Sequence, residues 1–271
     1  MITGLAETEL SERQFHKVKD LLYSVCGINL QPGKEGLVKA RLSRRLRSLN
    51  LNDYDAYLSY VKQDESGREL SMMVDALTTN KTDFFREPQH FDFLRQSVLP
   101  GLAQANRPLR FWSAACSSGE EPYSLAIQLF EALPNLNRMD AGILATDISS
   151  DILKKARRAV YTPEVLQGLS EARLRRYFAR QKNGPTITYQ VHDQIRNLIH
   201  FARLNLMQPW PMKGPFDVIF CRNVMIYFDQ STRQQLIQRF YELLRPGGYL
   251  FIGHSESLTG IAGSFRYIQP A

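Results

Sequence analysis

The stretch Arg110-Phe-Trp-Ser-Ala-Ala-Cys-Ser-Ser-Gly119-Glu-Glu-Pro-Tyr-Ser-Leu-Ala-Ile127 decides the fold. A short apolar run is followed by small residues around one glycine and then by a periodic apolar segment, which predicts strand, tight turn and helix. The small side chains let a ligand approach the backbone. Glu120 and Glu121 place two carboxylates in the first helical turn, where they would also stabilise the helix dipole without a ligand. Both interpretations stay open at this point.

This turn does not suit a pyrophosphate. Dinucleotide-binding folds place the phosphates on the helix N-terminus and use three glycines in a G-x-G-x-x-G pattern, whereas this turn has one glycine and two acids. The two carboxylates would repel a phosphate and attract a cation. S-adenosylmethionine carries both an amino group and a sulfonium, so we predict it as the cofactor.

The composition is that of a folded globular protein. Hydrophobic residues make up 44% of the 271 residues and charged residues 23%, which excludes a disordered chain. No apolar run approaches the roughly 18 residues that span a bilayer, and the N-terminus lacks a secretion signal, so we expect a cytoplasmic protein without membrane insertion. Cys26, Cys116 and Cys221 are far apart, which favours buried thiols over disulfides or a zinc site, and no metal is predicted.

Positive charge is concentrated on one predicted helix near the N-terminus. The net charge is +7, and residues 39–47 contain no acid. The basic residues of this stretch are Lys39, Arg41, Arg44, Arg45 and Arg47. Such a helix face attracts an anionic partner, with an ordinary solvated face as the alternative.

Residues 1–90 are predicted to be all helical. Apolar residues recur at helical spacing, and cap-type residues mark the ends of the segments. Helices are expected from about Ser11 to Gly27, Leu37 to Leu49, Asp53 to Lys62 and Glu69 to Leu77. Residues 78–88 hold too many cap-type and β-branched residues for a helix interior and are expected to form a loop.

Residues 91–271 alternate between strand and helix patterns. Strands are expected at Leu109 to Ala115, Ala141 to Thr146, Phe216 to Cys221 and Tyr249 to Gly253, and helices at Glu121 to Leu133, Asp151 to Val160 and Thr232 to Leu244. This alternation predicts an α/β fold with a parallel sheet, whose ligands bind beyond the carboxyl ends of the strands. Residues 177–203 depart from the rhythm and are expected to form a small antiparallel β-subdomain inserted in the fold.

Polar residues follow the predicted strands at that edge. Asp147 lies where an acid beyond the glycine turn accepts ribose hydroxyls, although a helix N-cap would also explain it. Asn205 and Leu206 suit an adenine edge and face, with a turn asparagine as the alternative. Arg222 and Asn223 place hydrogen-bonding groups in an otherwise apolar crevice.

Two further residues near these strands have a structural alternative. Tyr227 follows three apolar residues and suits the core as well as the crevice. His254 is expected to be a satisfied structural histidine rather than a base, because nothing nearby in the sequence forms a nucleophile with it.

With these residues assembled, the chain resembles the chemotaxis receptor methyltransferases, the CheR-type family. The resemblance rests on Leu77-Thr-Thr-Asn-Lys-Thr-Asp-Phe-Phe-Arg-Glu87, Trp112-Ser-Ala-Ala-Cys-Ser-Ser-Gly-Glu-Glu-Pro-Tyr-Ser124, Ala145-Thr-Asp-Ile148, Phe216-Asp-Val-Ile-Phe-Cys-Arg-Asn-Val-Met-Ile-Tyr-Phe228 and Gly253-His-Ser-Glu256. It implies a helical N-terminal domain, a class I S-adenosylmethionine-dependent methyltransferase domain with a Rossmann-like doubly wound sheet, and an inserted β-subdomain. It also implies methyl esterification of glutamate side chains on the cytoplasmic helical region of methyl-accepting chemoreceptors, the adaptation step of chemotaxis, with S-adenosylhomocysteine as product.

The resemblance also assigns site residues. Those implied around the cofactor are Asn80, Thr82, Arg86, Glu121, Asp147, Asn205, Leu206, Arg222 and Asn223. Arg86 and Tyr227 match the polar pair that the family places near the transferred methyl. The five basic residues at 39–47 match its receptor-docking helix, which implies association with chemoreceptor arrays. A regulatory protein acting through the N-terminal domain is a second candidate partner.

The resemblance leaves one function and one boundary open. In many members the β-subdomain grips a peptide at the receptor's C-terminus, but this chain has only one glycine in Gln181-Lys-Asn-Gly-Pro, where some of those relatives have a more glycine-rich turn. The chain ends at Pro270-Ala271, earlier than many relatives, and whether it is trimmed also stays open.

The implied reaction needs little acid–base chemistry. A glutamate carboxylate has a pKa near roughly 4.3 and is already ionised at neutral pH, so the expected work is alignment and exclusion of water. Arg86 is expected to hold the second carboxylate oxygen and Tyr227 to orient it.

Two other functional classes compete with this one: a binding module on a degenerate methyltransferase fold, and a small-molecule or nucleic-acid methyltransferase. The sequence contains no Asn-Pro-Pro-Tyr-type base-handling motif, so nucleic acid is not an expected partner.

Overall fold

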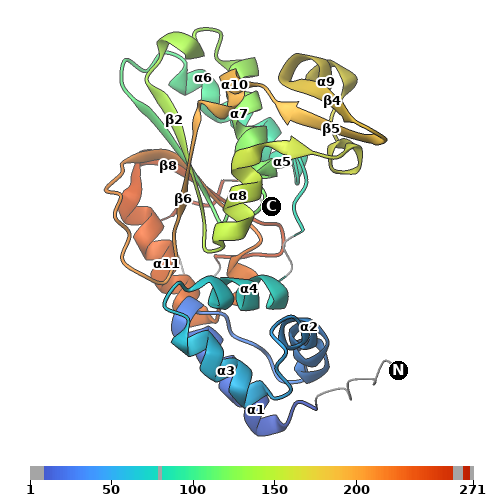
Figure 1. The fold of residues 1–271 in the computed structure, drawn as a ribbon. Helices are drawn as coiled ribbons and strands as arrows, with labels where there is room; N and C mark the ends of the chain where they lie inside the picture. Colours follow the sequence, from blue (N-terminus) through green and yellow to red (C-terminus); the bar gives the residue numbers. More distant parts are fainter. Residues whose placement is uncertain (1–8, 79–80, 259–264, 269–271) are drawn as a thin grey trace. The chain divides into compact units, whose positions relative to one another are not determined.

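The computed structural model describes residues 9–78, 81–258 and 265–268 (Figure 1). The chain divides into two compact units, which we call the helical unit (residues 1–80 with Tyr227–Asp229) and the sheet unit (residues 81–226 with 230–271). The division falls ten residues before the expected boundary at residue 90. Phe84 and Phe85 explain the difference, because both are buried in the core of the sheet unit. No helix in the described ranges is both long and apolar enough to cross a membrane.

The helical unit follows the expected helices closely. Its helices are α1 (Glu12–Cys26), α2 (Glu35–Ser48), α3 (Tyr54–Gln63) and α4 (Arg68–Leu77). Ser11 and Gln14 form a capping box at the start of α1, and Gly27 ends it in the left-handed conformation at φ 71°. Asp53 caps α3 by accepting the Ala56 N–H at 2.9 Å. The cap residues that marked these ends in the sequence therefore act as caps.

The sheet unit is built on a five-stranded parallel sheet in the order β6-β2-β1-β7-β8, which confirms the predicted α/β fold. Its strands are β1 (Leu109–Ala114), β2 (Ala141–Asp147), β6 (Ile199–Arg203), β7 (Phe216–Cys221) and β8 (Leu244–Ile252). The main covering helices are α7 (Glu120–Ala132), α8 (Ser150–Arg158) and α11 (Gln230–Leu243). Helices α7 and α8 pack against β2 and β6, and α11 packs against β8. Strand β8 begins five residues before its expected start, because a bulge separates the pairing of Leu244 from that of Tyr249.

Short elements complete this unit. Before the sheet come α5 (Pro88–Phe93), the π-helical turn η1 (Leu94–Val98) and α6 (Leu99–Leu102); later come the 3₁₀ turns η2 (Leu136–Arg138), η3 (Pro163–Leu166) and η4 (Met225–Tyr227), with helices α9 (Glu171–Tyr177) and α10 (Asp193–Arg196). The last residue of η4 belongs to the helical unit.

A second, antiparallel sheet has the order β3-β5-β4, from β3 (Val160–Tyr161), β4 (Phe178–Asn183) and β5 (Thr186–Val191). The expected insert at 177–203 is thus corrected at both ends. The run at 199–203 pairs in parallel with β2 in the large sheet, and Val160–Tyr161 joins the small one. Periodicity over five residues cannot tell a parallel strand from an antiparallel one, and a two-residue strand has no periodicity.

The strand register brings the predicted polar residues to one edge. Ala114 at the end of β1 pairs with Thr146 of β2 and Cys221 of β7, while Asp147 pairs with Arg203. The segments that follow these strands therefore leave the sheet side by side, at the edge beyond which such folds bind ligands, and we call this region the crevice.

Candidate functional site

The turn after β1 is held in an unusual backbone conformation. Ala115, Ser117 and Gly119 all have positive φ, at 65°, 50° and 99°. A Cβ on Gly119 would lie 3.0 Å from the Tyr161 hydroxyl oxygen and 3.0 Å from Ala156 Cβ, so only glycine fits here. The packing fixes the turn at the start of α7 and leaves its small side chains at the crevice.

Asp147 joins this turn to the next strand. One carboxylate oxygen accepts the Ser117 N–H at 2.8 Å and the other accepts the Ser149 N–H at 3.0 Å. The cap of α8 is Ser149, which accepts from Ile152, so the N-cap interpretation of Asp147 is wrong. An ionised carboxylate has about four acceptor positions, so these bonds are compatible with the predicted contact to ribose hydroxyls.

Glu120 and Glu121 lie side by side in the sequence but have different surroundings. Glu120 is 3% exposed, and burial raises its pKa to about 7 against the opposing effect of the Ser118 hydroxyl, which donates to it. Glu121 accepts from Ser113 at 2.7 Å and lies 3.3 Å from Arg222 Nη1. Burial raises the pKa of Glu121 as well, although Arg222 and Ser113 favour its ionised form. Both carboxyl groups would therefore gain from a nearby cation.

Arg222 is buried between two carboxylates. Its side chain is 2% exposed, and it contacts Glu121 on one side and Glu87 on the other, with Nη2 to Glu87 Oε2 at 2.8 Å. The same guanidinium donates to the Arg86 carbonyl oxygen. Most N–H donors of Arg222 are thus hydrogen-bonded to other groups of the protein. Arg222 therefore links Glu87, Glu121 and the Arg86 backbone, and its expected place around the cofactor stays a prediction.

Glu87 is a functional residue that the sequence analysis missed. It adopts a left-handed backbone at φ 56°, and its Oε1 accepts from the Asn223 amide at 3.1 Å and from the His254 N–H at 3.4 Å. Burial alone would raise the pKa of Glu87, but hydrogen bonds and charge from Arg222, helped by Asn223, lower it to about 2. One ionised carboxylate therefore ties together the segments after β7 and β8 and the loop that precedes α5. Its place directly after Arg86 in a family-like block was the only available signal.

Glu256 makes a similar connection between the segments after β7 and β8. Its carboxylate accepts backbone N–H bonds from Gly253 at 2.6 Å, Asn223 at 3.1 Å and Ile226 at 3.3 Å. A Cβ on Gly253 would lie 2.5 Å from the Asn223 amide nitrogen, so glycine is needed for this close approach. Asn223 is itself at φ 58°, and Glu256 holds it in that conformation.

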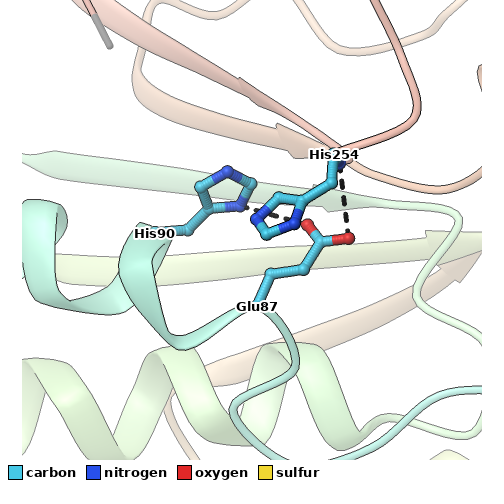
Figure 2. A group of neighbouring side chains, drawn as sticks. All are labelled: Glu87, His90 and His254. Carbon is cyan, nitrogen blue, oxygen red and sulfur yellow. Dashed lines mark hydrogen bonds and ion pairs between the residues drawn. The ribbon is translucent and has the colours of Figure 1, made fainter. Parts of the chain in front are cut away.

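Glu87, His90 and His254 form a cluster that could be taken for a metal site (Figure 2). Their ligand atoms lie within 4.8 Å of one another, and His90 Nδ1 is buried without a hydrogen bond in the described structure, 3.4 Å from Glu87 Oε2. Burial and the charge of Arg222 lower the pKa of His90 to about 4, so its ring is neutral. However, both Glu87 oxygens already accept hydrogen bonds from Arg222 and Asn223, which competes with coordination of a metal ion. We therefore interpret the Glu87 carboxylate of this cluster as the partner of Arg222 rather than as a metal ligand.

His254 makes structural contacts within this cluster. Its backbone donates to Glu87, and its exposed ring meets the His90 ring edge-on at 5.4 Å between centroids. Its expected role as a structural histidine rather than a base stays a prediction.

The predicted catalytic residues are only partly placed by the structure. Arg86 is half-buried, and its Nη1 donates to the Lys81 carbonyl at 2.7 Å. Thr82 is half-buried in the same loop, and Asn80 lies outside the described residues. Tyr227 belongs to the helical unit, where its carbonyl accepts the Asn29 N–H at 2.8 Å. A pairing of Arg86 with Tyr227 stays a prediction.

Asn205 and Leu206 follow β6 beside Asp147. The Leu204 N–H donates to the Asp147 carbonyl at 2.9 Å, which puts the next residues at the same edge. Asn205 Oδ1 accepts the Met207 N–H at 3.0 Å, as in an Asx turn, and Leu206 is 8% exposed. The turn interpretation of Asn205 is therefore confirmed, and contact with an adenine remains a compatible prediction.

The basic helix α2 is not uniformly free to bind a partner. Arg45 forms a bidentate pair with Glu69 of α4, at 2.9 and 2.7 Å, and Glu69 also accepts from the Tyr57 hydroxyl. Lys39 contacts Glu9 at 2.8 Å, and Arg41 donates to the Thr78 carbonyl. Arg44 and Arg47 are exposed. Residues 39–47 of the helix contain no acid, but α4 supplies one, Glu69.

The crevice as a whole is built to hold positive charge. Glu87 and Glu121 present two carboxyl groups to the single guanidinium of Arg222, while Asp147 adds a third acid and Glu120 a fourth. Two of the four have pKa values raised by burial, which a bound cation would reverse. These residues therefore fit a positively charged cofactor and would oppose a phosphate.

Comparison with known proteins gives a consistent result. Residues 13–78 match the family model described as "CheR methyltransferase, all-alpha domain", and residues 80–270 match "CheR methyltransferase, SAM binding domain". A "Probable chemotaxis protein methyltransferase" of Rhizobium etli is 44% identical over 89% of this chain and 91% of that protein. The "Chemotaxis protein methyltransferase" of Salmonella typhimurium is 40% identical over 94% and 88%, and "Chemotaxis protein methyltransferase 2" of Pseudomonas aeruginosa is 42% identical over 95% and 91%.

Proposed function

The chain belongs to the CheR methyltransferase family, and on this premise we propose that it transfers the methyl group of S-adenosylmethionine to glutamate side chains of chemoreceptors. The reaction forms a bond between a carboxylate oxygen and the methyl carbon while the carbon–sulfur bond breaks. The products are a glutamate methyl ester and S-adenosylhomocysteine. The setting is the cytoplasmic region of chemoreceptors, and hence the cytoplasm and the chemoreceptor arrays.

One observation carries the proposal for the cofactor. Arg222 is a single guanidinium facing two carboxyl groups, Glu87 and Glu121, beside a turn that only glycine permits at residue 119. The surplus acid supports binding of a cation at this place. Bound there, the cofactor supplies an electrophilic methyl group on a sulfonium. Glu121 and Asp147 would hold it, with Asn205 and Leu206 on the base. The remaining residues nearby would be Asn80, Thr82, Arg86, Arg222 and Asn223.

Arg86 would position the substrate carboxylate. Its carbonyl is held by Arg222, and the side chain of the next residue, Glu87, is held by the segments after β7 and β8, so the loop that carries Arg86 is fixed. A fixed guanidinium can bind one carboxylate oxygen and leave the other to attack. Tyr227 would add a hydroxyl that orients the same group. No general base is needed, because the carboxylate is ionised at neutral pH.

Helix α2 is the proposed docking surface for receptors. Acidic residues on receptor helices would be steered by its exposed cations, of which Arg44 and Arg47 are the strongest candidates. Arg41 and Lys39 remain in the proposed surface. Arg45 would contribute through the helix that it holds in place.

The decisive experiment is transfer of labelled methyl to a cytoplasmic receptor fragment, followed by mild alkali. We expect the label to be released as methanol, because esters hydrolyse and N-methyl groups do not. Arg86→Ala should lower turnover at least tenfold while S-adenosylhomocysteine affinity, measured by calorimetry, changes less. Alkali-stable label would contradict a glutamate ester, and normal turnover would remove Arg86 from the mechanism.

A further inference from the structure

A clamp outside the predicted site holds the loop after β6. Arg239 of α11 donates from Nη1 to the Leu206 carbonyl at 2.6 Å and from Nη2 to the Gln208 carbonyl at 2.6 Å. Trp210 Nε1 donates to the same Leu206 carbonyl at 3.2 Å. Two side chains thus converge on one loop carbonyl, which is more than a surface turn requires.

The clamp is itself rigidly supported. The Arg239 guanidinium lies 3.8 Å from the centre of the Trp210 ring, and Trp210 packs on Phe240 at 5.1 Å and edge-on to the buried Trp112 at 4.9 Å. Trp112 lies in β1, and its Nε1 donates to Thr146 of β2 at 2.9 Å. The loop is therefore anchored to the central strands β1 and β2 through Trp210 and Trp112.

The clamped loop has a precise place in the crevice. Leu204 donates to the carbonyl of Asp147, and Asn205 closes an Asx turn onto Met207. Fixing the Leu206 and Gln208 carbonyls fixes the direction in which Asn205 and Leu206 face the crevice. An amide can distinguish an amino group from a carbonyl on a base edge only if its backbone is held still.

We propose that Arg239 is a positioning residue that sets the selectivity of the cofactor site for adenine, acting through the loop 204–208 and its stacked partner Trp210. This inference rests on the proposed use of S-adenosylmethionine. Arg239 touches no part of the cofactor, and its effect is on binding and base discrimination rather than on the methyl-transfer step.

The test compares S-adenosylhomocysteine with S-inosylhomocysteine, in which the 6-amino group of the base is replaced by an oxo group. Their dissociation constants are measured by calorimetry for the full chain and for Arg239→Ala, Arg239→Lys and Trp210→Phe. Gln234→Ala, an exposed change on the same helix, is the matched control. Turnover is measured at saturating S-adenosylmethionine.

We expect Arg239→Ala to weaken S-adenosylhomocysteine binding about tenfold and to reduce its preference over the inosyl analogue, with turnover within twofold of the wild type. Arg239→Lys keeps one donor and should recover part of both effects, and Trp210→Phe should show a smaller loss. If Arg239→Ala does not fold, Arg239→Lys decides by the same criterion. An unchanged preference in the folded variants overturns the inference, even if their melting temperatures fall. Failure of the wild type to bind S-adenosylhomocysteine would instead contradict the proposed function.

Discussion

Each unit contains an arginine paired with acidic side chains, half-buried Arg45 in one and buried Arg222 in the other, and the two have different partners. In the helical unit Arg45 meets one carboxylate, Glu69, in a bidentate pair to which Tyr57 adds a hydrogen bond. In the sheet unit Arg222 meets two carboxylates, Glu87 and Glu121. In the first group one positive charge, on Arg45, faces one negative charge, on Glu69, and we call this a closed pair. In the second, two carboxyl groups share the Arg222 guanidinium, and the charge of Arg86 also acts on Glu121.

This difference in charge balance predicts different roles. The Arg45 group stabilises the helical unit, whereas the Arg222 group can bind a ligand. A closed pair in low dielectric offers nothing to a third charge, whereas an excess buried acid is costly until a cation arrives. The raised pKa of Glu121 expresses that cost, because burial favours its neutral form in the absence of a ligand. The crevice is therefore the place where a cationic ligand gains most.

The largest expected effect is from Arg222→Met. Without the guanidinium, Glu87 and Glu121 face each other unpaired, so we expect the free energy of unfolding of the sheet unit to fall by about 3–5 kcal/mol. Urea unfolding followed by circular dichroism measures it. Adding Glu87→Gln to Arg222→Met should recover part of the loss, since one unpaired charge is removed. A loss below about 1 kcal/mol would show that the cluster is well solvated.

Arg45→Met should destabilise the helical unit by about 3 kcal/mol, because Glu69 is left buried without a counter-charge. The double variant Arg45→Met with Glu69→Leu should lose less. Unlike Arg222→Met, this change should leave S-adenosylhomocysteine affinity within twofold in calorimetry. A large loss of cofactor affinity in Arg45→Met would contradict the contrast between a closed and a binding group.

Glu120→Gln should stabilise the protein in alkaline buffer. The pKa of Glu120 is about 7 in the folded state and about 4.5 ordinarily, so the folded state binds the extra proton between these values and stability falls as pH rises through 7. Above pH 7 the variant avoids this cost, which is on the order of 3 kcal/mol, and near pH 4.5 the two proteins should be alike. Melting temperatures across this range provide the measurement. A constant difference at all pH values would contradict a buried titrating carboxyl.

Glu87 has the opposite sign, and it provides an internal check on the same melting series. Its pKa is lowered to about 2, so the stability it contributes is present above pH 4.5 and is lost as the pH falls toward 2.

The smallest effect is expected from reversing the charge of Arg44 and Arg47, the two exposed arginines of α2 discussed above. Arg44→Glu with Arg47→Glu should raise the KM for a receptor fragment about tenfold at low salt, with cofactor affinity unchanged. The difference should shrink in high salt, because exposed charges are screened. Lys213→Glu, an exposed change outside this helix, is the control. Equal KM values for the paired variant and the wild type would mean that the helix face is merely solvated.

The sequence predicts most elements here because their local signals agree with the tertiary structure. The strand at Phe216–Cys221 is found with its expected bounds, and Ser11, Gly27 and Asp53 act as the caps that they suggest. The small sheet was misjudged because strand pairing is a long-range property, absent from the local pattern of residues 199–203.

The site was predictable in position but not in the division of roles. Strand ends and the Gly119 turn indicate where polar residues gather, and Asp147 and Glu121 do lie there. Arg222 pairs with Glu87, which lies 135 residues away in the sequence, and Arg45 pairs with Glu69, which lies 24 residues away. Distant partners of this kind leave no trace in local charge patterns.

The most direct test of the excess acid in the crevice is calorimetric binding of S-adenosylmethionine at pH 7.5 to the wild type and to Glu121→Gln. This substitution keeps the size of the side chain and leaves Arg222 with one carboxylate, as in the closed pair of the helical unit. We predict binding at least tenfold weaker than in the wild type, and wild-type affinity that falls as the pH is lowered and the raised pKa of Glu121 is approached. Equal affinity of the two proteins for S-adenosylmethionine would contradict the account.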